Sequence, residues 1–432
     1  MHKKLNNNNS YRNILKATSL FAGVQGVNIL LNLIRAKLAA MLLGPAGIGL
    51  NSIYNETREF IHSTTNLGMD QSGTREIAKS TDTPDLADSV TLTRSWIILL
   101  AVFGMLVTAV FAYPLSWMLF SDGDHTWQIV ALSPAVSFST LTCGEMTVLR
   151  GLQQMKIIAW VSVLHVIIGV ITTIPLYYIW GMDGIIGALV LMTLSLAVVT
   201  MIFSYSIHPP KFCFRKNFLY KGKRMIQIGV SFMLAAIVAH MAMLIIQGVL
   251  NREGSIEIVG YYNSAYSICF VYVSLLFASL SQEYFPRLSS LFRNKDIREE
   301  CIKRQINVVF LLSIPLTVLM YFFMPWIVLL LLSVEFLPVV TIAQAAIITL
   351  PCRAIYLPLA YIPLAAGDSK LYFFMETLSY MIMVVGVLGG FHYWGLEGIG
   401  YALAIVNVMD MLCNLICVRL VYKLDIKKLF WF

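Results

Sequence analysis

Four basic residues lie inside otherwise apolar stretches of the chain, where a charge is costly. They are Arg35, Lys37, Arg58 and Arg353. A charged side chain at the centre of a bilayer costs about 2.5–3.5 kcal/mol on insertion scales, so it normally faces the interior of a helix bundle or a water-filled cavity. These residues are therefore candidates for a substrate-binding site, and their sign favours an anionic substrate.

The depth of two of these residues can be estimated from their distance to the turn at Gly44. Lys37 lies seven residues before this turn and Arg58 lies nine residues after Gly49, so at 1.5 Å per residue they lie roughly 10 and 13 Å from the same membrane face. Arg35 is about 200° around the helix from Lys37, so both can line one cavity only at its edges. A structural alternative is an ion pair, such as Glu56 with Lys37, that only joins two helices.

Three acidic residues are candidates for coupling transport to an H⁺ or Na⁺ gradient. Glu56 and Glu59 lie near Arg58 and neutralise part of its cluster, and Asp410 lies deep in a later apolar stretch. Glu145 and Glu376 lie near predicted cytoplasmic helix ends and are interpreted as solvated or capping residues.

The histidines and cysteines show no metal-site pattern. His165 and His240 are interpreted as hydrogen-bonded interior residues. The seven cysteines have no CxxC or Cys/His ligand spacing and are interpreted as small apolar residues. We therefore expect no metal and no cofactor.

The amino-acid composition indicates which kind of secondary structure holds these residues in place. Of 432 residues, 58% are hydrophobic and 12% charged, whereas a soluble protein has about 25% charged residues. At about 20 residues per span, the apolar residues suffice for about twelve membrane helices with short loops. No room is left for a soluble catalytic domain, and we expect an all-α integral membrane protein.

Polar, Gly- or Pro-rich breaks divide the chain into twelve predicted transmembrane helices. These are residues 14–43, 50–74, 91–118, 127–149, 157–178, 184–206, 225–250, 257–285, 305–332, 338–365, 371–392 and 396–418. An even number of spans predicts that both termini lie on the same side.

The basic residues predict which side that is. Twenty-six of the 31 Lys and Arg residues, Arg94 among them, are assigned to alternate breaks between spans, Arg252 alone lies in the other set, and four lie within spans. Because Lys and Arg are retained in cytoplasmic loops, both termini are predicted to be cytoplasmic. This distribution over short juxtamembrane loops also excludes nucleic acid as the reason for the net charge of +8.

An internal repeat divides the chain into two halves. Residues 180–189 (WGMDGIIGAL) and 394–403 (WGLEGIGYAL) share six of ten positions, and Asn51-Ser52-Ile53-Tyr54 resembles Asn263-Ser264-Ala265-Tyr266. Six spans separate the copies, so the repeat is parallel, and substrate sites in such transporters lie between the halves. We expect two six-helix lobes, 1–206 and 225–432, joined by a basic cytoplasmic linker, 207–224.

No enzyme signature is present in the sequence. It contains no GxxxxGK[ST] phosphate-binding loop, no HExxH and no GxSxG motif, and no predicted exoplasmic loop is long enough for a catalytic site. The chain is therefore predicted to be a transporter that does not hydrolyse ATP.

Several segments resemble the Wzx-type polysaccharide transporters, the lipid-linked oligosaccharide flippases of the multidrug/oligosaccharidyl-lipid/polysaccharide exporter superfamily. The segments are residues 37–50 (KLAAMLLGPAGIGL), 284–289 (YFPRLS), the charged loop 293–304, and the turn 367–370 (GDSK). The resemblance covers nearly the whole chain.

The resemblance implies alternating access by two six-helix lobes in the bacterial inner membrane. The implied substrate is an undecaprenyl-pyrophosphate-linked repeat unit of O-antigen, capsule or a related glycan, moved from the inner to the outer leaflet. Lys37 and Arg58 fall where that family has basic residues. A monomer acting with a glycan polymerase and chain-length machinery is expected. Three alternatives stay open: a cation-coupled multidrug exporter of the same superfamily, a lipid II flippase, and a scaffold for glycan-assembly enzymes.

Overall fold

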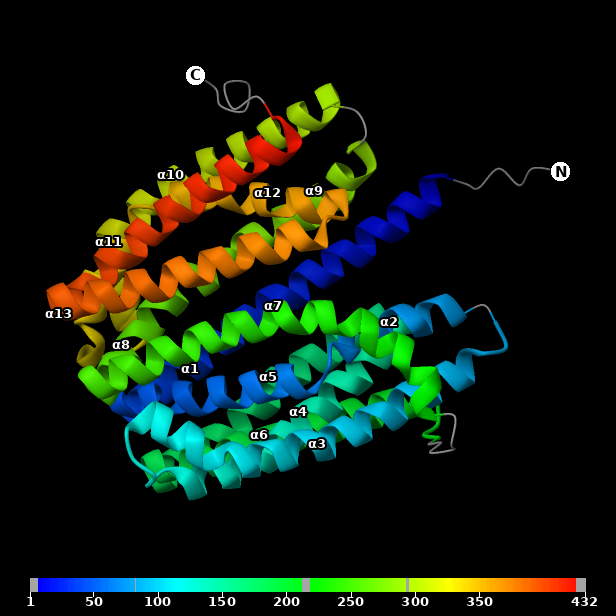
Figure 1. The fold of residues 1–432 in the computed structure, drawn as a ribbon, viewed down its shortest axis with the longest axis horizontal. Coiled ribbons are helices and arrows are strands. Elements are labelled where there is room, and N and C mark those ends of the chain that lie inside the picture. Colours follow the sequence, from blue (N-terminus) through cyan, green and yellow to red (C-terminus); the bar gives the residue numbers. More distant parts are fainter. Residues whose placement is uncertain (1–6, 82, 212–217, 293–294, 425–432) are drawn as a thin grey trace. The chain divides into compact units, whose positions relative to one another are not determined.

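The computed structural model describes residues 7–81, 83–211, 218–292 and 295–424, and every element in these ranges is helical (Figure 1). The elements are α1 (Asn7–Thr65), α2 (Met69–Ser80), α3 (Leu86–Phe120), α4 (Thr126–Gly151), α5 (Met155–Trp180), the 3₁₀ turn η1 (Gly181–Asp183), α6 (Gly184–Ile207), α7 (Phe218–Glu253), α8 (Ile256–Tyr266), the π-helical turn η2 (Ser267–Val271), α9 (Tyr272–Leu291), α10 (Lys295–Leu331), the 3₁₀ turn η3 (Val334–Phe336), α11 (Val339–Ile347), α12 (Leu350–Ala366) and α13 (Ser369–Tyr422).

Seven helical stretches in the described ranges are long and apolar enough to cross a membrane. The pair α11 and α12, bent by 59° at its break, would be an eighth. The prediction of an all-α membrane protein is therefore confirmed. Three of the seven stretches are 40, 53 and 54 residues long, whereas one crossing needs about 20 residues.

Each of these three long stretches is interrupted where the sequence predicts a turn. In α1 the backbone leaves the helical conformation at Gly44 (φ 62°), and in α13 at Gly395 (φ 60°). Glycine adopts positive φ without the steric cost that other residues incur. In the third stretch, η1 separates α5 from α6, and these two helices pack along each other.

The predicted span 50–74 is not a single helix. A continuous helix over 50–74 was expected, but α1 ends at Thr65 and a separate helix, α2, begins at Met69. The break contains Gly68 at φ 64°, and a Cβ atom there would lie 2.1 Å from the carbonyl oxygen of Gly229. Only glycine fits such a close backbone approach. Its positive φ angle lets the chain turn between the two helices.

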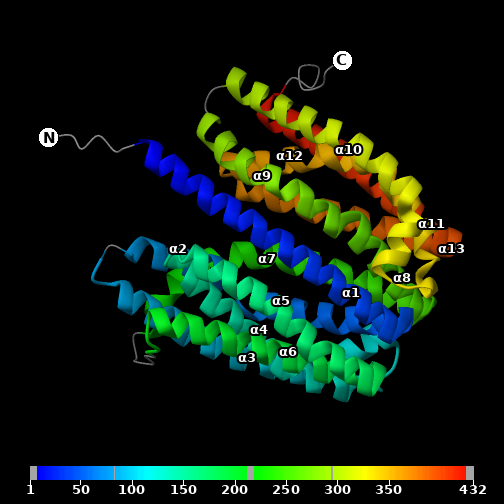
Figure 2. The ribbon, with the colours of Figure 1, turned by 180° about the vertical axis from the view of Figure 1, so that it is seen from behind.

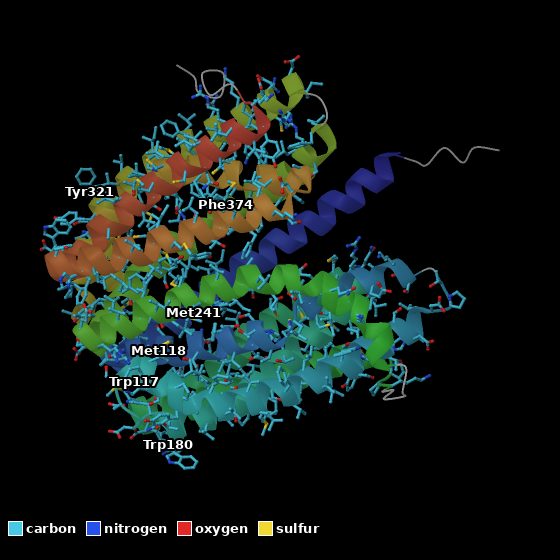
Figure 3. The ribbon with its side chains drawn as sticks, viewed as in Figure 1. Trp117, Met118, Trp180, Met241, Tyr321 and Phe374 are labelled. Carbon is cyan, nitrogen blue, oxygen red and sulfur yellow. The ribbon has the colours of Figure 1, made fainter. Side chains whose placement is uncertain are left out.

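The chain forms two compact units, each assembled from three stretches. The first consists of Met1–Leu42, Ile61–Phe111 and Gln128–Phe232. Helices α4, α5 and α6 lie side by side in it (Figures 1 and 2). Its core contains the buried clusters Met69, Trp96, Leu100 and Met225, and Leu149, Ile158 and Val161. Trp180, at the end of α5, projects away from the helices (Figure 3).

The second unit consists of Leu43–Phe60, Ala112–Trp127 and Met233–Phe432. Helix α12 packs between α10 and α13, and α11 also packs against α13. Its core is a cluster that includes Tyr284, Leu288, Ile302, Ile306, Leu359 and Val418. The predicted lobes 1–206 and 225–432 stay a prediction, and part of the predicted linker lies outside the described residues.

Candidate functional site

The second unit contains a cavity with a polar lining. The volume of the cavity is about 70 Å³. Three ionisable side chains, Arg353, Glu376 and Asp410, line it together with Asn407 and Ser379. Three tyrosines, Tyr266, Tyr356 and Tyr380, complete its polar lining.

The kink in α13 brings the two carboxylates of this cavity together. Glu376 lies 19 residues before Gly395 and Asp410 lies 15 residues after it. At 1.5 Å per residue both are about 22–28 Å from the kink, one on each arm of the helical hairpin. They therefore lie at similar depth although they are far apart along the chain.

Arg353 is supplied by the proline-rich helix α12. Its guanidinium carbon lies 4.7 Å from the centre of the Phe270 ring. Phe270 belongs to the π-helical turn η2, and such turns are frequent at functional sites. The Nε atom of Arg353 is buried and has no hydrogen-bond partner among the described residues. A cation–π contact of this kind holds the cation in place and leaves its hydrogen-bond donors available.

Asp410 is buried, with 8% of its surface exposed. Its Oδ1 atom has no hydrogen-bond partner within the described part of the chain. Nearby, Asn407 donates to the Thr349 hydroxyl at 3.0 Å, and Asn414 donates to the backbone carbonyl of Asp410 at 2.9 Å. A buried carboxylate oxygen without a partner is costly unless it is protonated or meets a cation.

The cavity therefore holds two acidic groups and one basic group. No ion pair links Arg353 to Glu376 or Asp410 among those found in the described residues. Such a cavity can take up a proton or a small cation on the carboxylates while Arg353 presents a positive charge to an anion.

A second cluster of charges lies at the other predicted site residues of this unit. Arg58 donates to the Asn55 side chain at 2.9 Å and forms an ion pair of 2.5 Å with Glu59. The Oε1 atom of Glu56 lies 2.5 Å from Nδ1 of His240 in α7. Arg58 is therefore paired with Glu59, whereas the partner of Glu56 is a histidine.

The remaining predicted residues, Arg35 and Lys37, belong to the first unit and are half-buried in α1. Arg35 packs against α5: a Cβ atom on Gly169 would lie 3.1 Å from its Nη1 atom, and Tyr177 is close enough to feel its charge.

Two interpretations of acidic residues are wrong. Glu376, expected near a helix end as a solvated residue, lines the cavity. A helical period would have indicated this, because residues 376, 379, 380 and 383 and residues 403, 406, 407 and 410 all face the cavity with spacings of i, i+3, i+4 and i+7.

Glu145 was expected to be solvated and Arg94 to be a loop charge, but both are buried in the first unit. Arg94 of α3 is 1% exposed and binds both carboxylate oxygens of Glu145 at 2.9–3.1 Å. It also donates to the hydroxyl of Ser204 at 3.0 Å and to the carbonyl oxygens of His208 and Pro209 at 2.9 and 3.1 Å. The pair fastens α3 and α4 to the end of α6.

Two kinds of sequence comparison place the chain among known proteins. Residues 38–341 match the family described as "Polysaccharide biosynthesis protein". The chain is also 24% identical over 302 residues to the lipid III flippase of Escherichia coli K12, covering 67% of this chain and 70% of that protein. The Shigella flexneri lipid III flippase matches equally.

Solved structures of two transporter groups share the fold. The lipid II flippase MurJ, in an inward closed conformation, has a TM-score of 0.76 at 16% identity and covers 95% of this chain and 89% of its own. An inward-facing MATE family multidrug transporter of the MOP superfamily has a TM-score of 0.74 at 17% identity, with 91% and 94% covered.

These relatives are described as transporters, which agrees with the prediction of a transporter rather than an enzyme. The family match spans well over half of the chain, and its fold is that of the MATE and MurJ transporters. This multi-pass membrane protein thus belongs to the polysaccharide biosynthesis protein family.

Proposed function

We propose that this protein is a flippase that moves undecaprenyl-pyrophosphate-linked oligosaccharide units from the inner to the outer leaflet by alternating access. The observation that carries this proposal is the set of basic side chains within the membrane-spanning helices of a polysaccharide biosynthesis protein: Lys37, Arg58, Arg353 and Arg35. A pyrophosphate is multiply anionic, and in a cavity of low dielectric it forms strong charge-assisted hydrogen bonds with Arg and Lys.

The proposed topology has twelve spans with both termini in the cytoplasm of a bacterial inner membrane. Support comes from the interruptions at Gly44, η1 and Gly395, each of which divides an overlong helical stretch into two. The alternation of basic loops gives the same count.

Asp410 is the proposed coupling site for H⁺ or Na⁺, with Glu376 beside it. Its unpartnered Oδ1 atom and its position in a polar cavity support this role. The same two carboxylates favour a second candidate function, a cation-coupled multidrug exporter, because acidic cavities attract cationic drugs.

A deletion strain separates these functions. With the flippase we expect a lipid-linked O-antigen, capsule or related glycan unit to accumulate on the cytoplasmic leaflet, read by mass spectrometry of extracted lipids. Accumulation of lipid II would indicate a peptidoglycan flippase. No lipid intermediate but greater drug sensitivity would indicate the multidrug exporter.

Complementation of that strain tests the site residues. Arg353→Gln is expected to lower glycan export about tenfold or more, because a hydrogen bond to a charged group contributes about 1.5–3 kcal/mol. Asp410→Asn is expected to remove the dependence on the ion gradient. The exposed residues Arg150 and Asp183 supply the controls Arg150→Gln and Asp183→Asn. Wild-type export by Arg353→Gln at equal protein level would refute its assignment.

A glycan polymerase and chain-length machinery are the proposed partners, acting on the product in the outer leaflet. The protein is proposed to work as a monomer.

A further inference from the structure

The segment of α1 that follows the Gly44 kink crosses α8 with its backbone in contact. A Cβ atom on Gly49 would lie 2.0 Å from the carbonyl oxygen of Ile256, and one on Gly260 would lie 2.1 Å from that of Pro45. Both stretches belong to the second unit. No side chain fits at either glycine, so the backbones of the two helices are in direct contact here.

An ion pair also joins the same segment to α7. Glu56 lies two turns beyond Gly49, about 10 Å along the helix. Its Oε1 atom is 2.5 Å from Nδ1 of His240, which lies 184 residues away in sequence. Both side chains are partly buried, 29% exposed for His240 and 16% for Glu56.

Among the described residues, charged and titratable groups near His240 and its partner Glu56 come from α1 and α8. Glu56, Glu59 and Arg58 of α1 act on its ring, and Arg58 is paired with Glu59. From α8, Tyr262 and Tyr266 lie near Glu56. Among these groups, the Glu56 carboxylate contacts the ring and forms an ion pair with His240 when the ring is protonated.

We propose that His240 and Glu56 form a proton-binding site that holds α1 against α7 and α8 while His240 is protonated. Imidazole is the side chain that gains or loses a proton between pH 5 and 8. When the imidazolium gives its proton to water, the ion pair with the Glu56 carboxylate is lost, and at most a hydrogen bond from the neutral imidazole remains. The crossing at Gly49 and Gly260 then loses its ionic support and can separate.

This inference rests on the proposed alternating access, in which the crossing would open and close during the transport cycle. Proton release would favour opening, and proton binding would favour closure. The site would couple protons to the conformational cycle separately from the cavity around Asp410.

Hydrogen–deuterium exchange of residues 43–60 tests the proposal on the full-length protein in lipid nanodiscs between pH 6 and 8.5. After correction for intrinsic exchange, protection of this segment in the wild type should fall as pH rises, by at most about tenfold per pH unit for one proton. His240→Gln should show low protection and His240→Lys high protection, both independent of pH. Glu56→Gln should also lose the pH dependence.

Two histidine variants serve as controls. His165 of α5 is a half-buried histidine that is bonded to the Thr200 hydroxyl at 2.9 Å, and His165→Gln should keep the wild-type response. His125 contacts the tested segment directly, with Nδ1 2.8 Å from the Tyr54 hydroxyl. Burial lowers the pKa of His125, against the opposing charges of Asp122 and Asp124, so it stays neutral over most of this range.

An unchanged pH response in His240→Gln and Glu56→Gln would overturn the proposal, and so would its loss in His165→Gln or His125→Gln. Exchange needs no substrate. A pH-dependent segment in a protein whose deletion accumulates no glycan lipid would therefore refute the proposed function and leave the proton site standing.

Discussion

At the scale of residues, the charges of this protein differ in what surrounds them. Arg94 donates hydrogen bonds to four groups of the first unit: a carboxylate, a hydroxyl and two carbonyl oxygens at the end of α6. The guanidinium group of Arg353 instead lies over the ring of Phe270, and the residue lines the cavity of the second unit. Arg94 is thereby a structural residue and Arg353 a candidate for binding, although both are arginines within helices.

The Arg94 pair leads to a prediction about stability. Arg94→Ala or Glu145→Gln should destabilise the protein by about 3–5 kcal/mol, because removing one partner of a buried ion pair leaves the other charge uncompensated. The check is the temperature of half-unfolding, followed by fluorescence-detected size-exclusion chromatography. Arg304→Ala is the control: its pair with Glu300 is exposed and spaced i, i+4, and such pairs contribute about 0.3–0.5 kcal/mol. Equal shifts for Arg94→Ala and Arg304→Ala would contradict the structural role.

At the scale of elements, the helices are divided and joined at particular glycines. Gly44 and Gly395 take positive φ and let a long helix turn back, while Gly49 and Gly260 let two backbones touch. The sequence alone does not distinguish these four glycines. Their different structural roles depend on the backbone angle at each position and on the atoms that pack against it.

This difference can be measured with alanine substitutions. Gly260→Ala is expected to destabilise the protein by more than 1 kcal/mol, since its Cβ would overlap the Pro45 carbonyl and forced overpacking typically costs about 1–3 kcal/mol. Gly389→Ala should be neutral or slightly stabilising, because nothing lies within 4 Å of its Cβ position and alanine favours a helix over glycine. Thermal unfolding of both variants gives the comparison, and a stable Gly260→Ala protein would mean that the α1–α8 crossing is looser than described.

At the scale of the whole molecule, the proposed topology predicts the location of each loop. A reporter active only outside the cytoplasm should give signal when fused after Asp124, in the loop between α3 and α4. It should give none after Arg215, in the predicted linker outside the described residues. Signal at both sites would contradict the twelve-span arrangement with cytoplasmic termini.

The sequence by itself determined the membrane character, the helical class and the turns near Gly44, Met182 and Trp394. Hydropathy and glycine placement act over a few neighbouring residues, so they can be read along the chain. It also singled out Arg353, Asp410, Arg58 and Glu56, because a charge within an apolar stretch stands out locally.

Only the tertiary structure decided which of these charges meet. Asp410 faces Arg353 and Glu376 in one cavity, Glu56 contacts His240, and Arg94 binds Glu145. Their separations along the chain range from 34 to 184 residues, and no local pattern encodes such pairings. The partner of a buried charge is set by helix packing and by the turns at Gly395 and Gly44, so the same residue type forms a structural ion pair in one place and is a candidate binding group in another.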